Sequence, residues 1–438
     1  MTIGAANMNK KQIFSGVPAA CSLLLTTLVS VPVHAEDTAL WQALAGGKFD
    51  FSARYRYEHV DDDAAADQAN ASTIRTTLGY TTGVFYHFGV RLLAQDVRDV
   101  FVDDYNDGTG RPSAKTRYAV VPDPSDTDLA EGYLSFTGLP DTTVKLGRQF
   151  ITYRDAPFHR FMGNVLWRQN WQNHDAITIQ NKSLPDTTFS YGYSWNVNRI
   201  FSEEAIDPRA NWDSDSHFLN LKYGGFSYAK LEGYTYLIDF DNDRANSVAT
   251  YGGRMNGDYP FTEKARIIYT AEYATQDDYG SNPANVDEDY FLGEIGGGFT
   301  PGNGIDSLVL KFSYELLEGN GTTSFRTPLA TGHAYQGWAD RFLTTPADGI
   351  EDYYVTVVIK AFGATFIASY HDINSDNLDY DYGDELDLSL EKTFEKHYTL
   401  GSKIGIYDSD TNTTNIARDK QSLTADVTKV WAWAEIKF

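Results

Sequence analysis

The sequence has little cysteine and, after its first 35 residues, no long apolar run. Cys21 is the only cysteine, so the chain beyond it can form no disulfide within itself and offers no thiol nucleophile. A membrane helix needs about 18 to 20 consecutive apolar residues, and the chain after residue 35 has no such stretch. These absences exclude helical membrane spans and a disulfide framework.

Basic residues are also scarce. The chain carries 36 Lys and Arg against 60 Asp and Glu, a net charge of −24. A charge of this sign repels phosphates and argues against a nucleic-acid partner. Aromatic residues and glycine are abundant instead, with 29 Tyr, 25 Phe and 36 Gly. This composition favours β-strands with aromatic belts and tight turns.

The first residues have the three parts of a secretory signal peptide: two early lysines, an apolar core over 21–31, and small residues before Glu36. The alternative, a retained membrane anchor, needs a longer apolar span. We therefore predict a signal peptide at 1–35 and a mature domain at 36–438. Because the leader holds two lysines and no acid, its loss takes the net charge from −24 to −26.

Apolar and polar residues alternate with period two along the mature chain, most clearly at 308–316 and 386–391. Such alternation indicates strands with one apolar face. A soluble β-sandwich alternates in the same way. The pattern predicts about eighteen strands, at 47–58, 71–82, 85–97, 128–137, 141–149, 174–181, 186–197, 215–224, 226–239, 247–256, 262–276, 286–299, 306–318, 351–361, 364–374, 384–393, 397–407 and 424–438.

The connections between these strands distinguish a membrane barrel from a sandwich. Odd-numbered strands are followed mostly by long polar links, such as 98–127 and 319–350, and even-numbered strands by short ones, such as 82–84 and 362–363. Outer-membrane barrels have this asymmetry, with long loops outside and short turns in the periplasm. We predict an all-β, transmembrane antiparallel barrel in the outer membrane of a Gram-negative bacterium.

The non-apolar phase of each strand is expected to face the lumen. It places nine acids there: Asp50, Glu131, Glu232, Glu272, Glu294, Glu315, Asp387, Glu391 and Glu435. It places fourteen basic residues there: Arg54, Arg56, Arg75, Arg91, Lys145, Lys222, Lys230, Arg254, Lys264, Arg266, Lys311, Lys360, Lys403 and Lys437.

Acids cluster instead in the expected outer loops, at 61–63, 103–104, 277–278 and 372–384. A net-basic lumen beneath acidic loops favours anions once they enter the pore. The alternative is that the lumen charges pair into ladders that stiffen the barrel. The sequence leaves both interpretations open.

A barrel of about eighteen strands is too wide for wall side chains alone to fill, so we expect inserted loops or water. The links 150–173 and 319–350 combine arginine with aromatic rings, which can clamp carboxylates and stack on sugar faces. A surface loop can have the same composition. The residues expected at a constriction are Arg154, Arg160, Trp167, Trp171, Arg326, Trp338 and Arg341.

Several strings resemble the alginate-export family of outer-membrane porins: Leu146-Gly147-Arg148-Gln149, the segment 163–170 and Asp175-Ala176, and then 314–321, 327–334 and 337–340. The resemblance implies an eighteen-stranded monomer with an arginine-rich path for an acidic uronate polymer such as alginate, partly gated by loops. It also implies that Arg148 and Arg168 are pore cations. Arg148 lies on the apolar phase of its own strand, which indicates a bulge or a structural role.

The sequence carries weak signals for two further functions. An outer-membrane hydrolase needs a catalytic constellation, for which His174-Asp175 and His217 are weak candidates, and we predict no enzyme and no cofactor. Asp239, Asp241 and Asp243 are spaced like calcium ligands, but the glycine and distal glutamate of an EF-hand are absent. A loop-mediated surface-binding role also remains open.

The expected partners are an anionic solute, the bilayer with its lipopolysaccharide, and the barrel-assembly machinery. Divalent ions bridging the acidic loops to lipopolysaccharide explain those acids without a calcium site. The assembly partner is expected because the last strand ends on an aromatic residue, Phe438.

Overall fold

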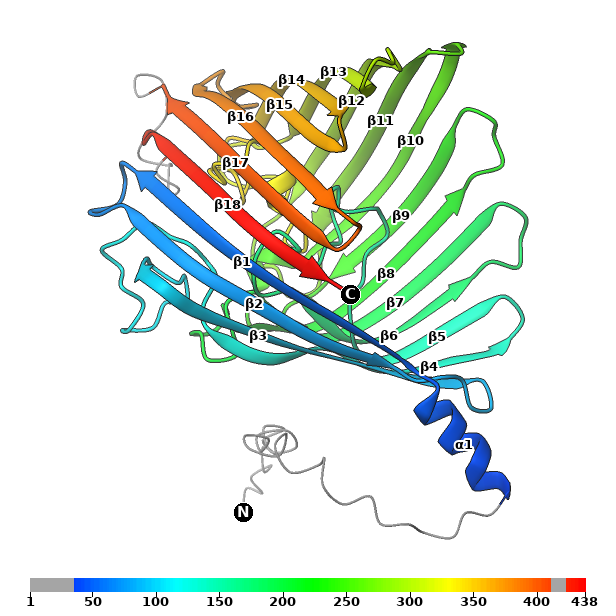
Figure 1. Cartoon of the computed structure of the whole chain (residues 1–438). Coiled ribbons are helices and arrows are strands. Elements are labelled where there is room, and N and C mark those ends of the chain that lie inside the picture. Colours follow the sequence, from blue (N-terminus) through cyan, green and yellow to red (C-terminus); the bar gives the residue numbers. More distant parts are fainter. Residues whose placement is uncertain (1–34, 411–422) are drawn as a thin grey trace, which may run out of the picture.

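The computed structural model describes residues 35–410 and 423–438. Residues 1–34, which hold nearly all of the predicted signal peptide, lie outside this part. Eighteen antiparallel strands form one sheet, and β1 pairs with both β2 and β18, so the sheet closes into a barrel. The predicted barrel is confirmed (Figure 1).

Every predicted strand has a counterpart whose bounds differ by a few residues. The strands are β1 Lys48–Asp62, β2 Ala69–Thr81, β3 Phe88–Asp104, β4 Asp126–Leu139, β5 Thr142–Gln149, β6 Asn173–Asn181, β7 Thr187–Asn198, β8 Asn211–Tyr223, β9 Lys230–Ile238, β10 Val248–Thr262, β11 Ala265–Asp278, β12 Asp287–Phe299, β13 Ile305–Leu317, β14 Ile350–Ala361, β15 Ala364–Asn374, β16 Asp381–Phe394, β17 Tyr398–Ser409 and β18 Val427–Lys437.

The two ends of the barrel differ as the sequence predicts. Even-numbered strands end in short turns, such as 140–141 and 362–363, at what we call the turn end. The long connections, including 150–172 and 318–349, follow odd-numbered strands at what we call the loop end. These two long loops fold back into the barrel (Figure 1).

The outer face of the wall is apolar. In β12 and β13 the side chains of Ile295 and Phe312 are 62% and 54% exposed, whereas their neighbours Glu294 and Lys311 face inward and bond to each other. Aromatic side chains are exposed near both ends, with Tyr273, Tyr353 and Tyr370 toward the loop end and Phe49, Phe88, Tyr259, Phe299, Phe362, Phe394 and Phe438 at the turn end. An apolar band between aromatic girdles is the outer surface of a membrane barrel.

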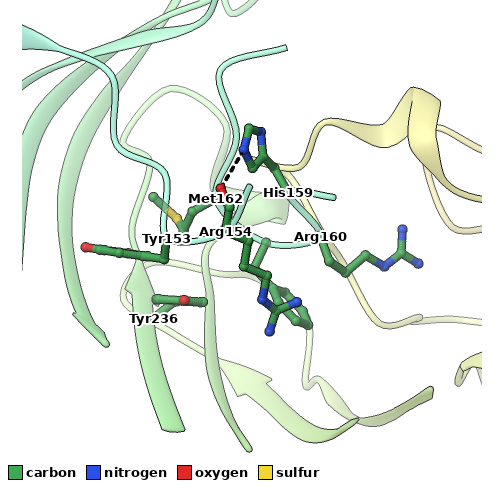
Figure 2. A pocket seen from close by; sticks show the side chains of 7 residues that line it. Tyr153, Arg154, His159, Arg160, Met162 and Tyr236 are labelled. Carbon is green, nitrogen blue, oxygen red and sulfur yellow. Dashed lines mark hydrogen bonds between the residues drawn. The ribbon is translucent and has the colours of Figure 1, made fainter. Parts of the chain in front are cut away.

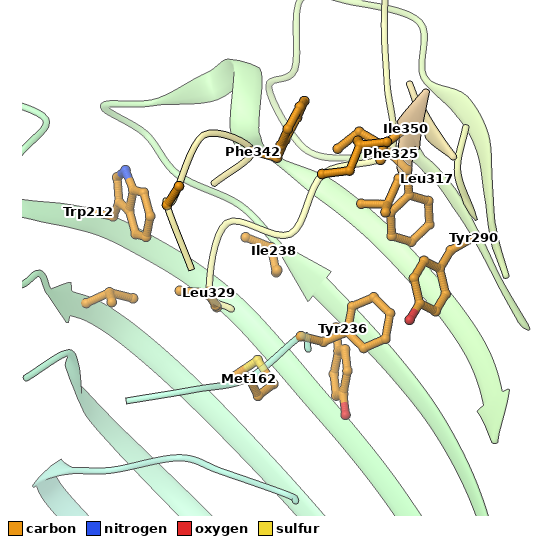
Figure 3. Close-up of a cluster of buried hydrophobic side chains, with 14 of the residues drawn as sticks. Met162, Trp212, Tyr236, Ile238, Tyr290, Leu317, Phe325, Leu329, Phe342 and Ile350 are labelled. Carbon is orange, nitrogen blue, oxygen red and sulfur yellow. The ribbon is translucent and has the colours of Figure 1, made fainter. Parts of the chain in front are cut away.

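An apolar core inside the barrel holds the inserted loops in place. Met162 of the first loop and Phe325, Leu329 and Phe342 of the second are buried. They lie among buried wall residues of β9, β12, β13 and β14, namely Tyr236, Ile238, Tyr290, Leu317 and Ile350 (Figure 3). Because close-packed apolar side chains resist displacement, both loops are fixed parts of the lumen.

The remaining elements are short. The helix α1 (Ala35–Ala45) precedes β1 at the turn end, and two single-turn 3₁₀ helices, η1 (Arg244–Asn246) and η2 (Gly332–Ala334), lie in loops. In the described part of the chain, no helix is both long and apolar enough to cross a bilayer.

Candidate pore constriction and vestibule

Arg168 joins three elements inside the barrel. It lies in the first inserted loop and is buried. Its guanidinium donates to Glu58 of β1 at 3.1 Å and to Asp340 of the second inserted loop at 2.9 Å, and it lies 3.6 Å from Asp123. Asp340 also pairs with Lys429 of β18 at 3.0 Å. The predicted pore cation is therefore surrounded by carboxylates and acts as a latch between the loops and the wall.

Two arginines of the wall strand β1 bond the backbone of the first inserted loop. Arg54 donates to the backbone carbonyls of Trp167 and Arg168 at 2.9 and 2.8 Å. Arg56 bonds the carboxylate of Asp123 and the carbonyl of Trp167. Both arginines point into the lumen, as the alternation predicts, because residues two apart on a strand share a face. Arg54 therefore holds the first inserted loop, and Arg56 joins it to Asp123 of the link between β3 and β4.

The second loop is docked on carboxylates of β16. The backbone N–H of Trp338 donates to Asp387 at 3.1 Å, and that of Ala339 donates to Glu385. Gly337 has φ +82°, and a Cβ there would lie 2.1 Å from the Glu385 carboxylate. Only glycine permits both this backbone conformation and this approach to the wall.

An aromatic stack joins the two loops. The rings of Trp167 and His333 are stacked, with centroids 4.5 Å apart and planes 3° apart. The Nζ atom of Lys403 lies 4.0 and 3.9 Å from the ring centroids of Trp167 and Trp338, within the range of a cation–π contact.

His333 is neutral in this stack, because burial lowers its pKa to about 3. Its Nδ1–H donates to Asp340 at 2.7 Å, and its Nε2 accepts from Lys403 at 3.1 Å. A proton on Nε2 would face the Lys403 ammonium.

Arg154 and Arg160, both predicted constriction residues, are held by acids of the wall. Arg154 donates to Glu232 at 3.0 Å and to Glu272 at 3.1 Å, and Arg160 lies 3.0 Å from Glu315. The ring of His159, between them in sequence, donates through Nε2 to the carbonyl of Arg154 at 2.9 Å (Figure 2). These contacts complete the docking of the first loop.

A vestibule of about 1090 Å³ lies between the inserted loops and the turn end. Its charged lining residues are Arg154, Lys222, Lys230, Arg254, Lys311, Lys360 and Lys403 with Asp155, Asp186, Glu232, Glu294 and Glu391. Trp167, Trp338 and Trp433 also line it. Of the predicted constriction residues, Arg154, Trp167 and Trp338 line this space.

Arginine and lysine side chains differ in their bonding partners in the lumen. Arg75, Arg91, Arg254 and Arg266 pair with carboxylates, as the inserted arginines do. Lys311 likewise pairs with Glu294 at 2.7 Å. Within residues 35–410 and 423–438, by contrast, no carboxylate lies within salt-bridge distance of four vestibule lysines, Lys222, Lys230, Lys360 and Lys403. The lumen charges therefore form ion pairs around the inserted loops, while these four vestibule lysines have no carboxylate partner among the described residues.

Two predicted lumen cations are wrong. Arg148 of β5 lies on the same face as the exposed Leu146, and it pairs there with Asp128 and Asp175 at 2.9 Å. The alternation along its strand predicts this outward position, whereas the resemblance predicts a pore cation. Lys264 lies in the exposed turn between β10 and β11, because β10 extends to Thr262 and the short turn takes up this residue.

The other predicted residues lie away from the vestibule. Lys145 faces the ring of Tyr133, and Trp171 lies against Arg75 at 4.2 Å. Arg326 is held through its backbone, which exchanges two hydrogen bonds with Gln276. Arg341 bonds Asp62 at 3.0 Å near the loop end.

The histidine and calcium candidates do not form sites. His174 and Asp175 are neighbours on β6 and point to opposite faces, and His217 is outward with Tyr191. Among the described residues no group of three or more His, Cys, Asp or Glu side chains is placed to hold a metal. Two of the three calcium candidates have other partners: Asp243 bonds Trp212 and Asn246, and Asp239 lies near Ser281, so that candidate is wrong.

One hydrogen-bond chain in the wall was missed by sequence reasoning. Ser369 Oγ lies 3.1 Å from His371 Nε2, whose Nδ1 lies 2.9 Å from Asp352. This is the order of a serine-hydrolase triad, but catalysis also needs N–H donors aimed at the oxyanion. Ser369 lies in the middle of β15, which is paired with a strand on each side, so the backbone there is committed to the ladders. The contacts are structural.

No family model matches the chain, and no curated protein matches it. Solved structures do. OccAB2 of Acinetobacter baumannii has 15% identity and a TM-score of 0.68, covering 91% of this chain and 99% of that one. OccAB4 of the same species has 12% identity and a TM-score of 0.67, covering 90% and 98%.

A structure of Pseudomonas aeruginosa OpdK with vanillate has 12% identity and a TM-score of 0.65, covering 90% of this chain and 99% of that one. All three neighbours are outer-membrane porins of the Occ/Opd kind. The chain is therefore similar in fold to these porins along nearly its whole described length.

Proposed function

We propose that the chain is an outer-membrane porin that passes anionic solutes through a net-basic vestibule. The observation that carries this proposal is the set of four lysines without carboxylate partners, which face a space large enough for a small solute. Fixed charges in a narrow, poorly screened pore act more strongly than in bulk water. The porin fold of the neighbours supports a channel rather than an enzyme.

Two classes of cargo follow from different observations. The resemblance to alginate-export porins favours an acidic sugar, such as alginate or its oligomers. The wall favours a small carboxylate with an apolar body, because Val358 and Ile367 form a cross-strand pair that lines the vestibule among its tryptophans. The OpdK structure contains vanillate, a compound of this second kind.

The proposed surroundings follow from the same architecture. A single chain closes the barrel, which supports a monomer. The acidic loops suit lipopolysaccharide bridged by divalent ions, and the last strand, β18, ends the barrel with the aromatic signal expected for the barrel-assembly machinery.

The direct test is ion selectivity. In planar bilayers under a salt gradient, the reversal potential of the purified protein is expected to show anion preference. Lys222→Gln with Lys360→Gln should move it toward zero. The charge-matched control, Lys115→Gln with Lys392→Gln, removes two lysines outside the vestibule and should leave it unchanged. Cation selectivity in the unmodified protein would contradict the proposal.

The cargo classes are separated by competition. Benzoate and glucuronate, added at equal concentrations, are compared for their block of the current carried by chloride. Stronger block by benzoate supports the carboxylate with an apolar body, and stronger block by glucuronate supports the acidic sugar.

A further inference from the structure

The helix α1 is attached to the outside of the barrel at its turn end. The backbone N–H of Gly83, in the turn between β2 and β3, donates to the carbonyl of Ala43 at 2.8 Å. The hydroxyl of Tyr80 donates to the carbonyl of Leu44. Tyr80 belongs to the outward phase of β2, since Thr77 and Gly79 are the inward residues. The C-terminal end of α1 is therefore fixed beside the lipid-facing surface.

Three large apolar side chains of α1 are exposed. Leu40, Trp41 and Leu44 are 43%, 57% and 42% exposed. At about 100° per residue they fall within one third of the helix circumference. Within residues 35–410 and 423–438 this face is left uncovered, although burial of such side chains is favourable.

The apolar face of α1 continues a surface that already meets lipid. The exposed aromatic residues Phe49, Tyr86 and Phe88 belong to the turn-end girdle beside the helix, and Val84 of the same turn is 65% exposed. Tryptophan is enriched at the interfacial layer of a membrane, and tryptophan with leucine forms the apolar face of helices that lie there. Continuity with the girdle therefore favours lipid over a protein partner.

We propose that α1 is an interfacial anchor, with Leu40, Trp41 and Leu44 inserted in the lipid headgroup layer at the turn end of the barrel. The barrel strands span the membrane without it, so the anchor adds a contact with lipid that the channel function does not require. It fixes the depth and tilt of the turn end around β1–β3 (Figure 1).

The test uses single cysteines in the full barrel. With Cys21→Ser as background, an introduced cysteine is unique. Leu40→Cys, Leu44→Cys and the control Gln42→Cys, on the opposite side of the helix, are each labelled with a nitrobenzoxadiazole dye. The proteins are reconstituted in phosphatidylethanolamine and phosphatidylglycerol vesicles with and without brominated acyl chains.

Dye at positions 40 and 44 should show blue-shifted emission and quenching by brominated lipid, with little of either at 42. No quenching at 40 and 44, or equal quenching at all three sites, would overturn the anchor. A second variant tests the attachment: a Cβ at Gly83 would lie 3.1 Å from the Ala43 carbonyl oxygen. Gly83→Val should therefore reduce quenching at 44 while the barrel stays folded, and unchanged quenching there would also contradict the proposal.

Discussion

Most arginine side chains in this lumen hold loops or wall acids, whereas the vestibule lysines Lys230 and Lys360 remain available to a solute. A guanidinium offers five donors in a planar fork, so one arginine can satisfy several loop carbonyls or carboxylates. Arg54 and Arg168 are used in this way. An ammonium is a flexible point charge, and Lys230 and Lys360 face the vestibule with no carboxylate partner among the described residues.

Replacing Arg168 with methionine should release the inserted loops. The change keeps much of the side-chain volume but leaves Glu58 and Asp340 without their shared cation. Glu58 keeps Arg56 and Asp340 keeps Lys429 as partners, so the cost should be smaller than the roughly 3 to 5 kcal/mol of a fully unpaired buried charge. We expect higher single-channel conductance and noisier current. Arg98→Met, which removes a half-exposed arginine outside the lumen, is the control. Equal conductance in both variants would show that Arg168 is no latch.

Sequence patterns place residues on strands better than residues in loops. The alternation of apolar and polar residues correctly places Arg54, Arg56 and Arg75 inside the barrel, because side chains along a strand point alternately to its two faces. It says nothing of Asp123 and Asp340, whose positions depend on how a long loop folds back. These two acids, which neutralise Arg168, were therefore missed. By contrast, Glu232, Glu272 and Glu315, which neutralise Arg154 and Arg160, lie on strands and were correctly placed in the lumen.

At the scale of elements, the two inserted loops are held differently. The first is fixed by wall arginines donating to its backbone and by its own arginines pairing with acids of the wall. The second presents its own backbone N–H groups to Glu385 and Asp387 of β16. All eighteen strands are visible in the sequence because each must turn one face to lipid. The docked loops need not turn a face to lipid. For each of them the sequence therefore leaves two alternatives, insertion into the lumen or a place on the surface.

A valine at Gly337 should open the second loop. The new Cβ would collide with the Glu385 carboxylate at a backbone angle that valine avoids. We expect a larger conductance with unchanged barrel assembly, read from heat-modifiable mobility on gels. Gly302→Val is the matched control, since Gly302 also has a positive φ, +79°, but nothing within 4 Å of its Cβ. The same conductance change in both variants would assign the effect to backbone strain alone.

At the scale of the whole molecule, charge is separated along the barrel axis. Acidic clusters lie at the loop end, at 61–63, 103–104, 277–278 and 372–384, as predicted. The unpaired lysines lie in the vestibule, which reaches the turn end. We therefore expect anions to be repelled at the loop end and concentrated at the turn end.

This polarity predicts rectification. In bilayers holding the barrel in one orientation, anion current entering from the turn end should exceed current entering from the loop end at 0.1 M salt, where the Debye length is about 10 Å. At 1 M salt, where it is about 3 Å, the asymmetry should disappear. Lys222→Gln with Lys360→Gln should weaken it. A symmetric current at low salt would mean that the axial charge does not control entry.

The different roles of arginine and lysine side chains also affect how the sequence of such a channel can change in evolution. Exchanging Lys230 or Lys360 should alter what the pore admits without touching a hydrogen bond or ion pair that positions a loop among the described residues, whereas Lys222 also donates to the Tyr153 carbonyl of the first inserted loop. Exchanging Arg54, Arg56 or Arg168 should disturb the contacts that hold the loops before it changes which solutes pass. Relatives that pass different solutes should therefore share the arginines and differ at the lysines, so that selectivity can change while the architecture stays constant.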